Sequence, residues 1–412
     1  MRQWIQNVRL ETGYEYEGED ITATKTELYH LLVAEGKIEQ IQPSSIRLPL
    51  DTNVIDGKGM LALPAFEEKH IHLDKTYFGG EWKAPTIGNR FKRVREEQKL
   101  LPQLREVTQE RAEKILTLLG ENGAVRVRTH CNIEPVSELH NLEATKRALE
   151  NYGDKISGEI VAFPQHGLLR SNSAALMKDA MRNGAHLVGG VDPATFDEDI
   201  EKSLHAMVDI AVQFNAGIDL HLHDRGHLGT YTMKRLAVLG KEAGLKGKIT
   251  ISHGYALGDI PEAELTEMIH LFQEMKMDLT SAVPIDLPGP PIPLLHENGI
   301  NVALGNDSIT DHWFPIGTGD MLEKARRLAE RFNWISERLL AKSLTFVTGG
   351  KLALDDDGNQ LWPKVGDEAS FVLVNASCSA EAVARGVTKR VVFNKGKQVF
   401  RQGINEDQRL LF

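Results

Sequence analysis

The chain has 412 residues, of which 41% are hydrophobic and 26% charged, a composition typical of a globular protein with a substantial core. Its formal net charge of -10 argues against nucleic acid or an anionic membrane as the main partner, because both select basic surfaces. The two cysteines, Cys131 and Cys378, lie far apart in sequence, so they form neither a disulfide framework nor a thiolate cluster. Any metal must be held by histidine and carboxylate.

The N-terminal segment, residues 1–59, shows the marks of β-hairpins. Short alternating stretches such as Leu31–Ala34 and Lys37–Ile41 are separated by the turn Glu35-Gly36. Met1–Gly13 lacks the basic and apolar regions of a secretory signal, and the chain has no run of about eighteen apolar residues. We therefore expect a cytoplasmic, soluble protein.

The central segment, residues 60–350, alternates short apolar runs with longer amphipathic ones, which is the pattern of a parallel sheet with helical crossovers. Eight runs read as strands: Leu61–His72, Ala124–Cys131, Glu159–His166, His186–Val191, Ala216–His223, Lys248–His253, Met277–Ala282 and Ile300–Asp307. Helices are predicted between them, as in Val107–Asn122 and Ile200–Asn215. This number and spacing predict a (β/α)₈ TIM-type barrel.

The C-terminal segment, residues 351–412, again reads as short strands, with Phe371–Val374 and Arg390–Phe393 as the clearest. Neither end of the chain is long enough to bury a full core alone. We predict that residues 1–59 and 351–412 meet as one small β-sandwich domain, interrupted by the barrel of residues 60–350.

Polar residues end nearly every predicted barrel strand. Reactive groups of such barrels lie at the carboxyl ends of the strands, so these residues are considered together. They are His70, His72, His130, Gln165, His166, Asp192, His221, His223, Asp224, His253 and Asp307. An isolated His-x-His pair is more often one buried and one exposed histidine, but the other strand ends favour a metal site here.

One ion can be ligated by His70, His72, His221 and Asp307, leaving a position for water. An open site of this kind is catalytic, because the metal lowers the pKa of its water and supplies hydroxide. His253 is placed to hydrogen-bond that water or polarise the attacked group, and Asp224 to carry its proton. A satisfied core histidine is the other interpretation of His253.

Several segments now carry a family resemblance. They include Pro64-Ala65-Phe66-Glu67, His70-Ile71-His72-Leu73-Asp74-Lys75, Arg128-Thr129-His130, Val161–Gln165, Asp219-Leu220-His221, Ser252-His253 and Leu304-Gly305-Asn306-Asp307. In this order they resemble the amidohydrolase superfamily, specifically its cytosine deaminase-like branch. The resemblance implies one Zn(II) or Fe(II) ion on the same four ligands and a substrate contact for Gln165. The binuclear branch carries a lysine at the end of strand four, where this chain has Gly189-Gly190-Val191-Asp192.

Three departures from that pattern bear on the substrate. Asp224 stands where cytosine deaminases carry a glutamate, and Ser308 replaces the aspartate that follows the strand-eight ligand. Lys75 instead resembles relatives that act on triazine-type rings, and it can hold a carbonyl oxygen or an anionic group. We expect Lys75, Gln165 and Ser308 to bind substrate. Arg225 adds positive charge near strand five, as either a substrate contact or a solvated loop residue.

These features predict a metal-dependent hydrolase of carbon–nitrogen bonds other than peptide bonds. A deaminase of a pyrimidine, triazine or pterin type of heterocycle is the leading hypothesis, with ion-activated water as nucleophile and Asp224, His253 and Asp307 as catalytic residues. The alternative is an amidohydrolase that cleaves a cyclic or linear amide. A barrel that only binds is a third reading, and the complete ligand set argues against it. The partner is a small molecule, and the sequence leaves the number of subunits open, a homo-oligomer included.

Overall fold

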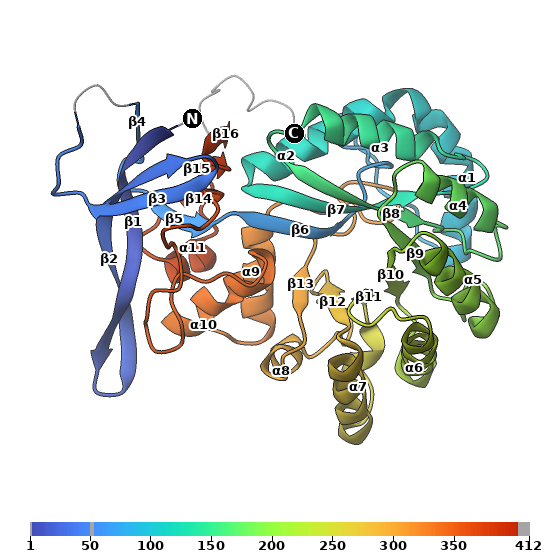
Figure 1. Cartoon of the computed structure of the whole chain (residues 1–412). Helices are drawn as coiled ribbons and strands as arrows, with labels where there is room; N and C mark the ends of the chain where they lie inside the picture. Colours follow the sequence, from blue (N-terminus) through green and yellow to red (C-terminus); the bar gives the residue numbers. More distant parts are fainter. Residues whose placement is uncertain (1, 50–52, 403–412) are drawn as a thin grey trace.

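The computed structural model describes residues 2–49 and 53–402, and it contains two eight-stranded sheets. One is a parallel sheet surrounded by helices, and the other is a mixed sheet that lies beside it, at the left of Figure 1. Among the described residues, no helix combines the length and the apolar character needed to cross a membrane.

The parallel sheet is the predicted barrel. Its strands are β6 (Phe66–Ile71), β7 (Ala124–Asn132), β8 (Ser157–Phe163), β9 (Leu187–Val191), β10 (Gly217–Leu222), β11 (Ile249–His253), β12 (Asp278–Ser281) and β13 (Val302–Leu304). They pair in chain order, and an isolated parallel bridge between Ile71 and Asp307 joins the last strand region to the first. The predicted (β/α)₈ architecture is confirmed, and each of the eight expected runs contributes a barrel strand.

Helices cover the outside of the barrel, most of them between successive strands (Figure 1). They are α2 (Thr108–Glu121), α3 (His140–Asn151), α4 (Ala174–Arg182), α5 (Ile200–Gln213), α6 (Gly226–Glu242), α7 (Glu262–Met275), α8 (Ile292–Glu297) and α9 (Met321–Arg331). Short 3₁₀ helices occur at Arg105–Val107, Tyr255–Gly258 and Ser343–Val347. Helix α1 (Arg90–Leu104) precedes α2 and is an addition that the sequence did not lead us to expect.

The mixed sheet joins both ends of the chain. Its strands are β1 (Arg2–Glu17), β2 (Asp20–Ala34), β3 (Lys37–Pro43), β4 (Val54–Asp56), β5 (Leu61–Pro64), β14 (Phe371–Val374), β15 (Arg390–Asn394) and β16 (Lys397–Arg401). Strand β14 pairs with β5, so the C-terminal strands continue the N-terminal sheet and the predicted meeting of the two ends is present. The strands form one mixed sheet where a β-sandwich was expected, and the strand that joins the two ends, β5, falls in the segment assigned to the barrel. The run Leu61–His72 is divided between β5 and β6. Helices α10 (Glu337–Lys342) and α11 (Ser379–Arg385) pack against each other beside this sheet.

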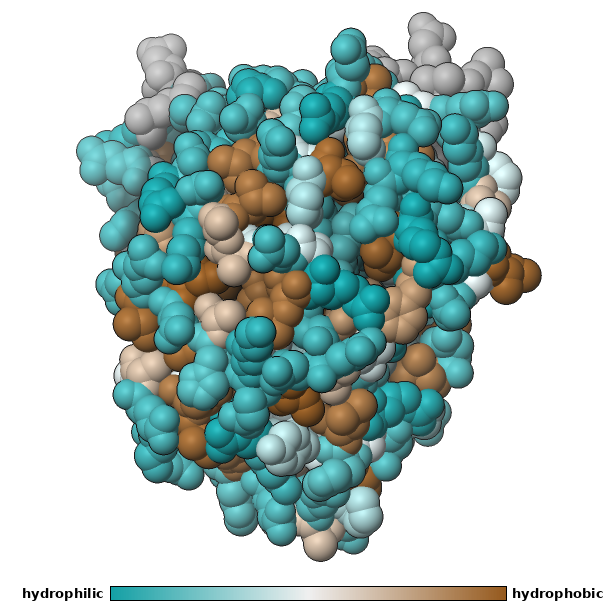
Figure 2. Space-filling view, turned by 90° about the vertical axis from the view of Figure 1, so that its right-hand side faces the viewer, coloured by the Kyte–Doolittle hydropathy of each residue, from teal (hydrophilic) through white to brown (hydrophobic). Residues whose placement is uncertain are grey.

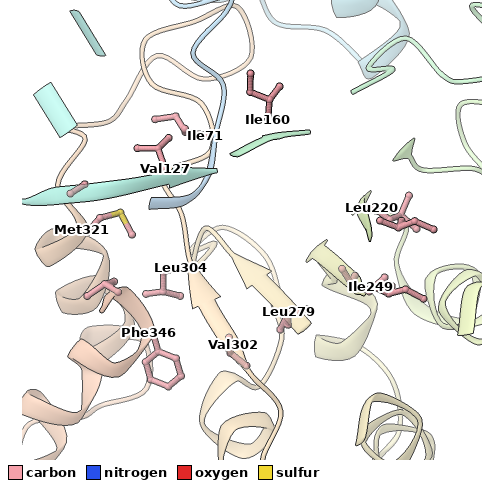
Figure 3. Packing of buried hydrophobic residues seen from close by; sticks show 14 of the residues in the cluster. Ile71, Val127, Ile160, Leu220, Ile249, Leu279, Val302, Leu304, Met321 and Phe346 are labelled. Carbon is pink, nitrogen blue, oxygen red and sulfur yellow. The ribbon is translucent and has the colours of Figure 1, made fainter. Parts of the chain in front are cut away.

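The main core lies between the barrel strands and their helices. Figure 3 shows side chains of this core on several strands, among them Ile71, Val127, Leu220 and Leu279, all of which are buried. The face seen in Figure 2 carries mostly hydrophilic residues with hydrophobic ones in small groups. The barrel is thus packed with apolar side chains, and the buried polar residues at the carboxyl ends of its strands stand apart from that core.

Candidate metal centre and active site

Five side chains meet at the carboxyl ends of four barrel strands. They are His70 on β6, His72 just after it, His221 on β10, His253 on β11 and Asp307 after β13. The Nε2 atoms of His70 and His72 lie 3.5 and 3.2 Å from Oδ1 of Asp307. Ligand atoms of His70, His221, His253 and Asp307 all lie within 4.8 Å of one another. The structure thus gathers the predicted ligands His70, His221 and Asp307 together with His253, and the fourth predicted ligand, His72, contacts this group through Asp307.

The backbone fixes Asp307 against the first strand. The N–H of Asp307 donates to the carbonyl of His70 at 2.7 Å, and the carbonyl of Asp307 accepts from the N–H of His72 at 3.3 Å. A Cβ on Gly305 would lie 2.5 Å from that of His70, so only glycine permits this approach. Asp307 and His253 have φ angles of 65° and 72°, a strained conformation that concentrates at functional sites.

A buried chain of hydrogen bonds orients His70. The hydroxyl of Ser252 donates to Asp219 at 2.6 Å, so it must accept from Nδ1 of His70, which lies 2.9 Å away. Arg128 donates to the other oxygen of Asp219 at 3.0 Å. The Nε2 lone pair of His70 therefore faces Asp307. This support is typical of a metal-ligating histidine, and the sequence analysis did not assign Ser252 or Arg128 that role.

The remaining imidazoles are also set up as lone-pair donors. Nδ1 of His72 donates to the carbonyl of His130 at 3.1 Å, which leaves its Nε2 free to ligate. Burial lowers the pKa of His72 to about 4, and it holds the pKa values of His221 and His253 well below their usual range. These histidines are neutral at pH 7.

Several buried ring nitrogens of the cluster have no hydrogen-bond partner among the described residues. They include Nε2 of His70 and both ring nitrogens of His221 and of His253. Such groups are costly to bury unless something binds them, and neutral imidazole with one carboxylate suits Zn(II) or Fe(II). The residues therefore fit a transition-metal ion.

The end of β9 offers no further ligand of the lysine type. A Cβ on Gly189 would lie 2.5 Å from the carbonyl oxygen of Ala162, so this position has no room for a side chain. Asp192, just beyond the strand, accepts from the ring of His223 at 3.0 Å and from Arg90 at 2.9 Å. The carboxylate of Asp192 is therefore already bound by His223 and Arg90, which is consistent with a site for one ion and not two.

A cavity of about 220 Å³ opens onto this cluster. Its lining residues are His72, Gly88, Arg90, Arg93, Phe163, Gln165, Val191, Asp192, Phe196, His221, His223, Asp307, Ser308 and Trp313. Of the three residues predicted to bind substrate, Gln165 and Ser308 line this cavity directly. Trp313 lines it as well and gives the cavity an aromatic wall beside Phe163.

Lys75, the third, lies directly behind the cavity wall. Its Nζ donates to Oε1 of Gln165 and is 3.7 Å from the buried carboxylate of Glu97 on α1. It also lies 5.9 and 5.8 Å from the ring centres of Phe163 and Trp313. Glu97 in turn accepts from Trp313 Nε1 at 2.7 Å. Lys75 therefore positions both the amide of Gln165 and the aromatic walls.

Asp224, the predicted proton carrier, lies next to the cavity and outside its lining. Thr195 donates to its Oδ1, Arg90 lies 3.7 Å from the same oxygen, and its Oδ2 has no partner among the described residues. Burial and the neighbouring Asp192 raise the pKa of Asp224. Arg225 pairs with Asp259 at 2.6 Å on the surface, so it is a solvated loop residue.

Comparison with known proteins decides the family. A model of the amidohydrolase family matches residues 88–400. The chain belongs to the amidohydrolase family. This amidohydrolase is 42% identical over 401 residues to the Uncharacterized protein YahJ of Escherichia coli (strain K12), a match that covers 96% of this chain and 87% of the relative.

Two solved structures of amidohydrolases are similar along their whole length. N-isopropylammelide isopropylaminohydrolase from Burkholderia multivorans ATCC 17616 has a TM-score of 0.85 at 30% identity, covering 97% of this chain and 98% of its own. 5-Methylcytosine deaminase from Klebsiella pneumoniae has a TM-score of 0.79 at 26% identity, covering 98% of each chain. These matches confirm the predicted cytosine deaminase-like branch and the class of carbon–nitrogen bond hydrolases.

Proposed function

We propose that this amidohydrolase removes ammonia or an amine from a nitrogen heterocycle of the pyrimidine, triazine or pterin type, using one Zn(II) or Fe(II) ion. The observation that carries the proposal is a cluster of neutral, unpartnered imidazoles around Asp307, open to a cavity with aromatic walls. His70, His72, His221 and Asp307 would hold the ion. When bound, it supplies Lewis acidity and lowers the pKa of water at the site.

Asp224 is proposed to accept the proton of the attacking water and to pass it to the leaving nitrogen. Its raised pKa makes it a stronger base than an ordinary aspartate, and its unpartnered Oδ2 is free to take the proton. Thr195 and Arg90 hold its other oxygen. His253, whose ring is stacked on that of His223 with centres 4.1 Å apart, is proposed to polarise the substituent on the attacked carbon.

The cavity walls are proposed to hold a flat ring. Phe163 is stacked on His221 with ring centres 4.0 Å apart, and Trp313 is locked by its hydrogen bond to Glu97. Gln165 and Ser308 offer an amide and a hydroxyl at the edge of that space, with Lys75 fixing the amide. An aromatic slot with a few polar groups is the usual form of a site for a planar ligand.

The relatives favour removal of an amino group over cleavage of an amide. One is named an isopropylaminohydrolase and the other a deaminase. Hydrolysis of a cyclic or linear amide is the second candidate. It is favoured by Ser308, because a neutral hydroxyl does not require the substrate to offer ring N–H groups, as the aspartate at this position in cytosine deaminases would. The two candidates use the same ion and the same proton carrier.

The test is turnover by metal-loaded enzyme on a panel of pyrimidines, triazines and pterins, with release of ammonia or amine as the signal. A new carboxylate would support the amide alternative, without released amine for a cyclic amide and with it for a linear one, whereas deamination gives a ring carbonyl and no carboxylate. No turnover of either kind across the panel would contradict the proposal. Asp224→Asn is expected to lower kcat by about 100-fold or more while metal content stays unchanged. An unimpaired D224N enzyme would assign the proton transfer to another residue.

A further inference from the structure

One wall of the cavity comes from helix α1, which lies outside the barrel repeat. Gly88, Arg90 and Arg93 line the cavity from this segment. The two arginines are three residues apart, so they lie on the same face of the helix. Two guanidinium groups therefore border a space of about 220 Å³ that already ends in the metal cluster.

Arg93 is anchored without being neutralised. Its Nη1 donates to the backbone carbonyls of His312 and Trp313, at 2.7 and 2.9 Å. Within residues 2–49 and 53–402 it forms no ion pair with a carboxylate. Carbonyl oxygens fix the direction of a guanidinium but leave its full positive charge, and its other N–H groups stay available for a planar anion.

Arg90, unlike Arg93, lies beside carboxylates. Its polar contacts among the described residues run through Nη1, to Asp192 at 2.9 Å and to Asp224 at 3.7 Å. Asp192 also accepts from His223, so this carboxylate is shared. The other acidic lining residue, Asp307, belongs to the metal cluster, and its neighbour Ser308 is neutral. Arg93 is therefore the lining arginine that has no carboxylate partner among the described residues, whereas Arg90 contributes a guanidinium that Asp192 and Asp224 already contact.

We propose that Arg93, assisted by Arg90, binds a carboxylate on the substrate, so that the preferred substrate is a carboxylated nitrogen heterocycle. Arginine binds carboxylates through paired, charge-assisted hydrogen bonds, which favours this anion over a neutral substituent. The size agrees: a cavity of about 150 Å³ holds benzene, so about 220 Å³ accommodates one six-membered ring with a small substituent. This inference rests on the proposed function.

The test compares matched ligands that differ only by the carboxylate. Binding of orotate against uracil, and of nicotinate against pyridine, is measured by calorimetry on metal-loaded enzyme. The wild type is expected to bind the carboxylated member of each pair about 10-fold or more tightly. Arg93→Gln is expected to remove that preference. Arg95→Gln is the matched control, since Arg95 loses the same charge on the same helix but does not line the cavity.

Two results would overturn the inference. A wild type without preference for the carboxylated ligands would do so, whether or not the enzyme hydrolyses rings. A preference that survives in Arg93→Gln would do so as well, because the carboxylate would then be held by another group, Arg90 or the ion, and not by Arg93. Failure of the proposed function looks different: no ring in the hydrolysis panel would react, while the Arg93-dependent preference for carboxylates would persist.

Discussion

Replacement of Glu97 by glutamine tests how helix α1 is tied to the active site. The Glu97 carboxylate is buried, accepts hydrogen bonds from Trp313 at 2.7 Å and His166 at 3.0 Å, and lies 3.7 Å from Nζ of Lys75. Glutamine has nearly the same size but no charge. The Glu97→Gln variant therefore leaves the buried ammonium of Lys75 with one anion fewer.

The size of the effect follows from the pKa of Glu97. Burial would raise this pKa, but Lys75 and His166 outweigh burial and lower it from 4.5 to about 2. That drop corresponds to about 3 kcal/mol, at 1.36 kcal/mol for each pKa unit. Because the pKa is lower in the folded state, this stability is present above pH 4.5 and is lost as the pH falls towards 2. Breaking a buried ion pair costs about 3–5 kcal/mol, so the value derived from the pKa of Glu97 falls in the range expected for such a pair.

Urea unfolding at pH 7 measures the effect, with the free energy of unfolding of Glu97→Gln expected to fall by about 3 kcal/mol. Glu96→Gln is the control, because Glu96 is the next residue on α1 and its carboxylate lies at the surface; this variant should resemble the wild type. Combining Glu97→Gln with Lys75→Met should cost less than the sum of the two single changes. A loss below about 1 kcal/mol, the value of a surface ion pair, would refute the reasoning.

Three further predictions concern the supports of the site. Ser252→Ala should weaken metal binding by about 10–100-fold without unfolding the protein, because His70 loses the partner that fixes its tautomer; unchanged affinity in a metal titration would contradict this. Gly305→Ala should lower metal content, since its new Cβ would meet the Cβ of His70 at 2.5 Å; full occupancy by elemental analysis would count against it. Glu134 outweighs burial and raises the pKa of His166 to about 9, so the free energy of unfolding should decline as the pH rises from 6.5 through 9. The His166→Gln variant should flatten this decline when urea unfolding is measured at several pH values.

The barrel and the cluster of histidines around Asp307 could be predicted because both follow from local patterns. Apolar runs with helical segments between them fix the strand order, and parallel strands bring their carboxyl ends to one side of the sheet. His70, His72 and His221 therefore had to meet once the fold was known. Asp307 required only that the eighth strand close on the first, which the bridge to Ile71 does.

Helix α1 escaped prediction because its sequence is mostly polar. Arg90–Leu104 has few apolar residues to mark a buried face, and Pro102 lies inside it. Its contribution to the site comes from charged residues, Glu97 buried beneath it and Arg93 lining the cavity, which sequence periodicity reads as solvent-facing. The cap Asn89, which accepts from the N–H of Lys92, is the signal that marked its start.

The most direct test of the account is stepwise addition of Zn(II) or Fe(II) to metal-free enzyme, with amine release from a reactive heterocycle measured at each step. A single site of His70, His72, His221 and Asp307 predicts that activity rises linearly and levels off at about one ion per chain. It also predicts that His221→Ala stays inactive at that ratio. Full activity without added metal, or a plateau only at about two ions per chain, would contradict the single-ion centre.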